Sequence, residues 1–61
     1  MKLRNAKKLD NMDQVQVRLE MGGWDYGYVL GTPRLVTPKL LIVAVLNSTD
    51  GLRHVSHTDV R

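Results

Sequence analysis

The sequence predicts a small all-β domain of about five short antiparallel strands, preceded by a basic segment that forms an arm or a short helix. Three observations support this class. Gln14 to Glu20 alternates between polar and apolar residues, which is typical of a half-buried strand. Leu40 to Leu46 is a short apolar run rich in β-branched residues. Gly, Pro, Asn and Asp divide the rest of residues 13–61 into short pieces, as turns do.

The size and composition of the chain limit the classes of protein that it can form. It has 61 residues, 43% of them hydrophobic and 25% charged, which fits one small globular domain. It has no Cys, so neither a disulfide nor a cysteine metal site is available. Its longest apolar run is far shorter than the ~20 residues of a membrane helix, and its start does not resemble a signal peptide. We therefore expect a cytoplasmic protein, in the host cytoplasm if a phage encodes it, without a cofactor or a membrane.

The charge of the chain divides it into two segments, residues 1–12 and residues 13–61. The whole chain carries +3, and residues 13–61 contain equal numbers of acidic and basic side chains. The excess lies in a basic N-terminal arm, whose cations are Lys2, Arg4, Lys7 and Lys8. Leu3, Ala6 and Leu9 recur every three residues in this arm, which fits one or two helical turns as well as an extended segment.

The remaining elements follow in order along the second segment. Gly22-Gly23 interrupts the chain before a second strand, Trp24 to Leu30. Pro33 and Pro38 predict a connecting loop over Thr32 to Lys39, because proline is excluded from central strands. After the apolar strand, four further features complete the domain: a hairpin turn at Asn47 to Gly51, a strand at Leu52 to Val55, a tight helical turn at Ser56 to Asp59, and the closing pair Val60-Arg61.

The run Leu40 to Leu46 is apolar on both faces of the predicted strand. A strand of this kind is normally covered on both faces. We expect the loop or the basic arm to cover its outer face within a small closed barrel, or a second copy of the chain to cover it. The second possibility makes this strand the seam of a structural homo-oligomer.

Two parts of the sequence resemble known small barrels. Trp24-x-x-Gly27-x-Val29 resembles the second strand of Tudor-type domains, and Gly27-Tyr28-Val29 is similar to the Gly-x-Val core of KOW motifs. His54 to Val60 resembles the end of SH3-like barrels, where a strand and one tight turn precede a last short strand. The resemblance covers roughly residues 13–61 and implies an SH3-like β-barrel. The chain lacks the acidic loop and the Pro-Ser-Asn-Tyr ending of peptide-binding SH3 domains, so a proline-rich ligand is not implied.

The orientation of the three aromatic residues is left open by the pattern. Trp24, Tyr26 and Tyr28 share one face of the predicted strand, and Gly27 and Val29 share the other. If the Tudor-like alignment holds, Gly27 and Val29 line the interior and the rings point outward. The alternative is that Trp24 and one tyrosine supply the bulk that a chain without Phe needs in its core. A methyl-lysine cage, implied only by the Tudor resemblance, is disfavoured because all aromatics lie within residues 24–28.

These features favour a non-catalytic binding module over an enzyme. We expect a protein partner to bind at Trp24, Tyr26, Tyr28 and Arg34. Small accessory proteins of bacteria and phages, which modulate a larger host machine for transcription or defence, offer an analogy. The alternative is direct nucleic-acid binding, with the basic arm on phosphates and the rings on bases.

The sequence contains one weak candidate for catalysis or metal binding. His54 and His57 lie near Asp50 and Asp59, but no Cys or third His accompanies them. Ser48 or Ser56 beside His57 and Asp59 does not form a triad pattern, because neighbours on one tight turn rarely converge. We therefore expect neither a catalytic residue nor a metal site.

Overall fold

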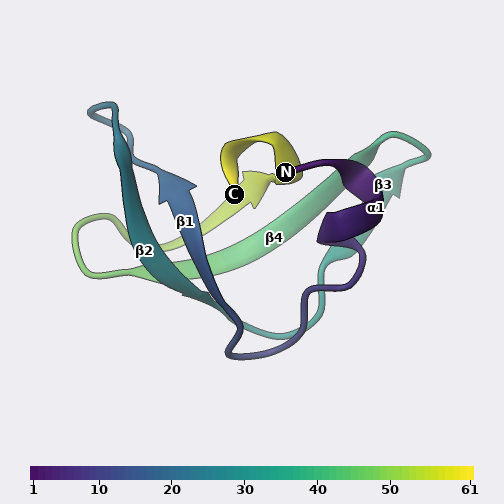
Figure 1. Ribbon diagram of the computed structural model, residues 1–61, viewed down its shortest axis with the longest axis horizontal. Coiled ribbons are helices and arrows are strands. Elements are labelled where there is room, and N and C mark those ends of the chain that lie inside the picture. The colour runs from purple at the N-terminus through teal and green to yellow at the C-terminus, as the bar shows by residue number, and fades with distance from the viewer.

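The computed structural model describes all of residues 1–61 and is composed mainly of β-strands (Figure 1). Its elements are α1 (Leu3–Ala6), β1 (Gln14–Arg18), β2 (Trp24–Val29), β3 (Arg34–Thr37), β4 (Leu40–Asn47), β5 (Gly51–Ser56) and the 3-10 helix η1 (His57–Asp59). The expected all-β class and the tight turn after the last strand are confirmed. Of the two forms left open for the arm, the structure has the short helix. No helix here is long and apolar enough to cross a membrane.

All five strands belong to one antiparallel sheet built around β4. β5 pairs with β4 from Ile42 to Asn47. Ile42 also pairs with Arg34 of β3, so β3 and β5 lie on opposite edges of β4. β2 pairs with the other half of β4, where Tyr28 lies opposite Leu46. β2 and β3 therefore follow one another along one edge of β4, and β1 extends the sheet beyond β2.

The expected loop over Thr32 to Lys39 is wrong, because its middle forms β3. The two prolines that suggested a loop lie at the ends of this strand rather than within it. β3 is an edge strand with a register shift, and all four of its side chains are exposed, so it has no alternating pattern. Edge strands tolerate nearby proline, which also discourages pairing with another chain.

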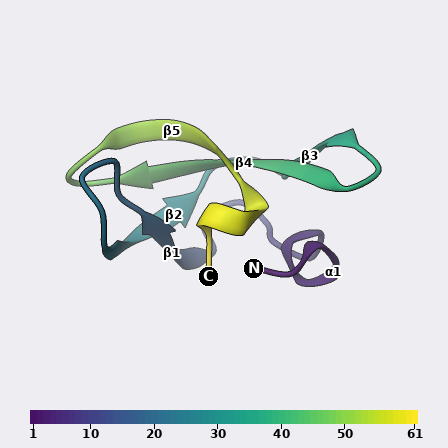
Figure 2. The same ribbon diagram turned by 90° about the horizontal axis from the view of Figure 1, so that it is seen from above.

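The sheet bends strongly but does not close into the expected barrel (Figure 2). β3, β4 and β5 form one layer, and the β1–β2 hairpin and α1 lie beneath it. The chain end after η1 reaches β1 through one isolated bridge, between Val17 and Val60. Backbone hydrogen bonds of 2.8 and 2.9 Å between Gln16 and Arg61 support this bridge. The backbone pairing between the first strand and the chain end is therefore limited to this short contact.

The core between the two layers consists of valine. Its cluster of buried residues is Val15, Val17, Val29, Val43, Val45, Val55 and Val60. The arm closes one side of this core, because Ala6 of α1 is fully buried and Met1 and Leu9 pack against the valines. The N-terminal amino group donates hydrogen bonds to the carbonyl oxygens of His57 and Val60. No aromatic side chain belongs to the core cluster.

The β4–β5 hairpin is held by the buried side chain of Asn47. Its Oδ1 accepts hydrogen bonds of 2.9 Å from the backbone N–H groups of Thr49 and Asp50. Its Nδ2 donates to the carbonyl oxygen of Tyr26 at 2.8 Å, which ties the turn to β2. Gly51 then begins β5 with a φ of 73°, a conformation that favours glycine. The hairpin predicted at Asn47 to Gly51 is confirmed.

Candidate interaction surface

The tyrosines of β2 point away from the core, and Gly27 and Val29 point into it. Tyr26 is 60% exposed and Tyr28 is 44% exposed. Gly27 is buried where β2 meets β4, and a Cβ atom there would lie 2.7 Å from Cγ1 of Val45 and 2.8 Å from the carbonyl oxygen of Leu46. This close approach requires glycine, which fixes the side of β2 that faces inward. The first of the two orientations predicted for the tyrosines is confirmed.

Tyr28 begins an exposed apolar row that crosses three strands. It pairs with Leu46 of β4, and Leu46 pairs with Leu52 of β5. Directly paired residues lie on the same face of a sheet. Leu46 is 45% exposed and Leu52 is 54% exposed. The row lies on the outer face of the sheet, opposite the valine core.

Two shallow grooves flank this row on the outer face. One, of about 410 Å³, is lined by Tyr26, Tyr28 and Leu46. The other, of about 450 Å³, combines four apolar side chains with two basic ones; its main residues are Leu30, Val36, Ile42, Ala44, Arg34 and His54. No acidic residue lines either groove. The side chain of Arg34 has no hydrogen-bond or ion-pair partner within the chain, so its guanidinium group is free to meet a ligand.

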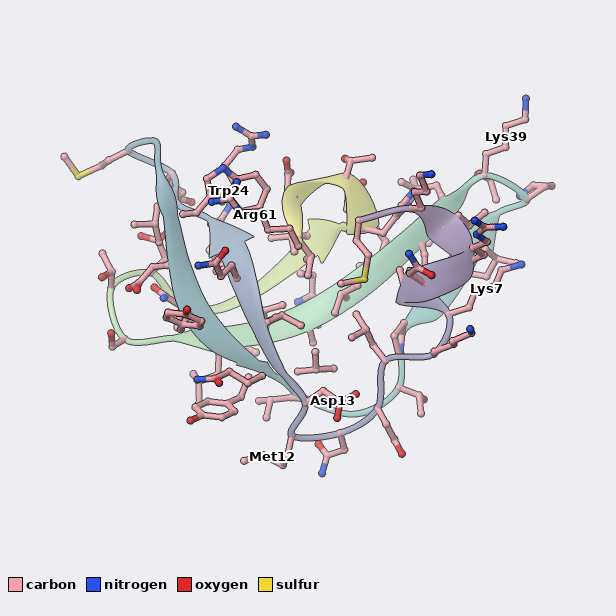
Figure 3. All side chains as sticks on the ribbon, in the orientation of Figure 1. Lys7, Met12, Asp13, Trp24, Lys39 and Arg61 are labelled. Atoms are coloured by element: carbon pink, nitrogen blue, oxygen red, sulfur yellow. The ribbon has the colours of Figure 1, made fainter.

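Trp24 is half-buried and belongs neither to the core nor to the exposed row. The guanidinium carbons of Arg18 and Arg61 lie 4.7 and 4.3 Å from the centre of its ring. Both arginines are themselves fixed: Arg18 Nε donates to Asp59 Oδ1 at 3.2 Å, and Arg61 Nε donates to Gln16 Oε1 at 2.9 Å. Figure 3 shows Trp24 beside Arg61, next to η1. The ring therefore fastens the chain end to the β1–β2 hairpin, and its faces are less available to a partner than those of the tyrosines.

The four cations of the basic arm are all exposed: Lys2, Arg4, Lys7 and Lys8. The arm begins beside the chain end, because the N-terminal amino group donates a hydrogen bond to the carbonyl oxygen of Val60, the residue before Arg61. Figure 3 shows Lys7 at the α1 end and Trp24 beside Arg61. Lys7 and the indole ring therefore lie on separate parts of the surface.

The histidines and nearby acidic residues do not converge on one point. His54 is exposed on the outer face, and His57 is buried. Nδ1 of His57 accepts a hydrogen bond of 3.2 Å from the backbone N–H of Leu41, which holds η1 against β4. Asp50 pairs with Arg53 and Asp59 with Arg18. No group of three or more His, Asp or Glu side chains is placed to hold a metal ion.

Leu52 was not predicted from the sequence as a surface residue for a partner, and Leu46 was included only as part of the possible homo-oligomer seam over Leu40 to Leu46. Two sequence features could have indicated these leucines: the run of β4 that is apolar on both faces, and the hairpin that follows it. The pairing register of that hairpin decides which residues of β5 join the outer face, and a one-residue shift would move all of them to the other side. Lys39, in the turn between β3 and β4, was not grouped with the cations of the basic arm, because it lies far from them in sequence.

Comparisons of the chain with protein-family models, with curated proteins and with solved structures gave no significant match. The function proposed below is therefore inferred from the outer face of the sheet.

Proposed function

We propose that this chain is a non-catalytic binding module that docks on a larger protein through the outer face of its sheet. The observation that carries the proposal is the exposed row of Tyr28, Leu46 and Leu52 on three paired strands. Contiguous exposed apolar patches on small proteins are costly and commonly mark interaction sites. Tyrosine is enriched in such sites because its ring adds contact area at a small cost in conformational entropy.

The charge of the outer face indicates the chemistry of the partner. Arg34 and His54 border one groove, and no carboxylate accompanies them. A complementary surface would place apolar side chains over the row and a carboxylate against Arg34. A stable interface buries about 800 Å² on each partner. The chain exposes 4104 Å² in total, so such a contact would occupy about a fifth of its surface.

A second copy of the chain fits this face less well than a different protein. A symmetric dimer brings the same patch of both copies together. It would place two copies of Arg34 on one interface that contributes no carboxylate from its grooves. Like charges in one interface oppose association. We therefore favour a partner that is acidic and apolar over a homo-oligomer.

The SH3-like assignment is part of this proposal. Three features of the fold support it: the meander of five antiparallel strands, the single 3-10 turn after β5, and the placement of Val60 beside β1. Small SH3-like modules serve many unrelated functions, so the fold alone does not identify a partner. By analogy, we propose that the chain is an accessory protein that modulates a larger bacterial or phage-targeted machine.

Site-specific photo-crosslinking tests the docking face. A photoreactive amino acid at Leu52 should give a discrete crosslinked protein in cells of the source organism. The same group at Met21, which is 97% exposed at the tip of the β1–β2 hairpin, serves as the matched control and should not. Excess wild-type chain should compete for the crosslink. Excess Leu46→Asp or Arg34→Glu chain, shown by circular dichroism to be folded, should not compete.

Two results would contradict the proposal. Equal crosslinking from the Leu52 and Met21 positions would show that the outer face has no special role. A crosslinked product of twice the 6.9 kDa mass of the chain would instead support the homo-oligomer.

A further inference from the structure

Five exposed cations gather at the α1 end of the molecule. They are Lys2, Arg4, Lys7, Lys8 and Lys39. Lys39 lies in the turn that leads into β4, and α1 packs against β4, so two segments far apart in sequence contribute to one surface. Figures 1 and 2 place α1 and this turn at the same end of the chain, and Figure 3 shows Lys7 and Lys39 there.

None of these five cations has an acidic partner. The three ion pairs of the chain all involve Arg18 or Arg53, at the other end of the sheet. Asp10, the acidic residue within the arm, and Asp13, the next one along the chain, stabilise a turn instead. Asp13 Oδ2 accepts the backbone N–H of Asp10 at 2.9 Å, and Asp10 Oδ1 accepts that of Asn11 at 2.8 Å. Figure 3 shows Asp13 well away from Lys39. Positive charge at the α1 end is therefore not neutralised within the chain.

The arm holds its cations on a fixed platform. Ala6 is fully buried, and Met1 and Leu9 pack on the valine core. The N-terminal amino group also donates a 3.0 Å hydrogen bond to the carbonyl oxygen of His57. Met1, Ala6 and Leu9 thus face inward, and the cations of the arm face outward. Charges held in place lose less conformational entropy on binding than charges on a loose tail.

We propose that this surface, which we call the basic end, binds the phosphate backbone of nucleic acid. Its ligand is a polyanion with closely spaced charges, and duplex DNA carries one charge per about 1.7 Å of its axis. Met12 is the one exposed apolar side chain of the arm, and Figure 3 shows it well away from Lys7 and Lys39. The cations of the basic end therefore have no exposed apolar side chain of the arm beside them to insert into a lipid layer, which favours nucleic acid over a membrane. Figure 3 shows Trp24 apart from Lys7 and Lys39, and neither the arm nor the β3–β4 turn contains an aromatic residue with which to read bases. Binding is therefore independent of sequence.

Fluorescence anisotropy with a labelled duplex DNA tests this proposal. If all five cations contact phosphates, log K falls with log salt with a slope of about −4.5, a loss of about 500-fold between about 50 and 200 mM salt. Lys7→Gln and Lys39→Gln should each weaken binding and reduce the slope by about 0.9. Arg53→Gln, which removes one positive charge from β5 where Asp50 and Glu20 already pair with it, is the matched control; shown by circular dichroism to be folded, it should leave the slope unchanged.

Lys39→Gln is the decisive variant because it separates a composite surface from a basic tail. An unchanged slope in Lys39→Gln, or no binding at about 50 mM salt, would overturn the proposal. Vesicles containing anionic lipid are the competing ligand, since Leu35 and Val36 are exposed on neighbouring β3. Tighter binding to vesicles than to DNA, lost in Leu35→Ser, would assign the basic end to membranes. Leu46→Asp should not alter DNA binding, so this proposal and the docking face can fail separately.

Discussion

The two faces of β4 have similar composition and opposite environments. On the inner face, Leu41, Val43 and Val45 are at most 2% exposed. On the outer face, Ile42 and Ala44 are half-buried and Leu46 is 45% exposed. The inner face is covered by the β1–β2 hairpin, η1 and α1, as Figure 2 shows, whereas no element of the chain covers the outer face.

Because of this difference, the two faces of β4 contribute to different properties: the inner face to the stability of the domain, and the outer face to its capacity to bind. Apolar area contributes about 25 cal/mol per Å² only where it is removed from water. The inner side chains therefore stabilise the fold, and the outer ones contribute little until something covers them. Under the proposed docking function, the inner face of this strand serves folding and the outer face serves binding to the partner.

Neighbouring substitutions on β4 should show the largest contrast. Val45→Ala removes two buried carbons and leaves a cavity, which should lower the free energy of unfolding by about 2 to 3 kcal/mol. Leu46→Ala removes more carbon atoms from an exposed position and should cost less than about 1 kcal/mol. Urea unfolding followed by circular dichroism measures both. A domain of this size is stable by only about 3 to 9 kcal/mol, so the first variant should be visibly closer to unfolding.

The reverse order would contradict the comparison. If Leu46→Ala proved as destabilising as Val45→Ala, the outer face would be covered in solution, and the homo-oligomer would become the better proposal. Repeating the measurement at several protein concentrations distinguishes the two cases, because only an oligomer gains stability with concentration.

The contrast between the faces also explains which parts of the fold could be predicted. Strands with one buried face, such as β1, have a period of two in their sequence and were located within two residues. β3 has no buried face, so its sequence contains no such pattern. Its pairing is possible only because β4 extends beyond the residues that pair with β2. A predicted closed barrel became an open sheet because closure depends on contacts near Val60 that no local pattern specifies.

The candidate surface was predictable only in part, for a similar reason. Tyr26 and Tyr28 were selected because the aromatic residues cluster on one face of a predicted strand, and their direction follows from the inward position of Gly27. Leu46 and Leu52 join them through strand pairing, which a single sequence does not specify. The environment of Trp24 depends on Arg61, which is distant in sequence, so alternation along β2 could not resolve it.

Gly27→Ala tests how closely the inner faces of β2 and β4 must meet. The added Cβ would lie 2.8 Å from the carbonyl oxygen of Leu46, a backbone atom that cannot move without disturbing the sheet. We expect a loss of about 2 kcal/mol from overpacking. Tyr26→Ala, on the outward side of the same strand, is the control and should cost less. Thermal unfolding compares them, and a Gly27→Ala variant as stable as wild type would show that β2 and β4 are not packed this tightly.

Trp24 is intermediate between the two environments and should give the smallest effect. Its ring is half-buried beneath Arg18 and Arg61, and exposed cation–π contacts are each worth about 0.5 to 1 kcal/mol. Trp24→Ala should therefore destabilise the domain by about 1 kcal/mol and leave it folded. If the cation–π contact is responsible, Arg61→Gln should lower the free energy of unfolding less in a Trp24→Ala background than in wild type. A double-mutant cycle, followed by chemical denaturation, measures this difference. Complete unfolding of Trp24→Ala would place the ring functionally with the inner face, as part of the core that holds the chain end against β1.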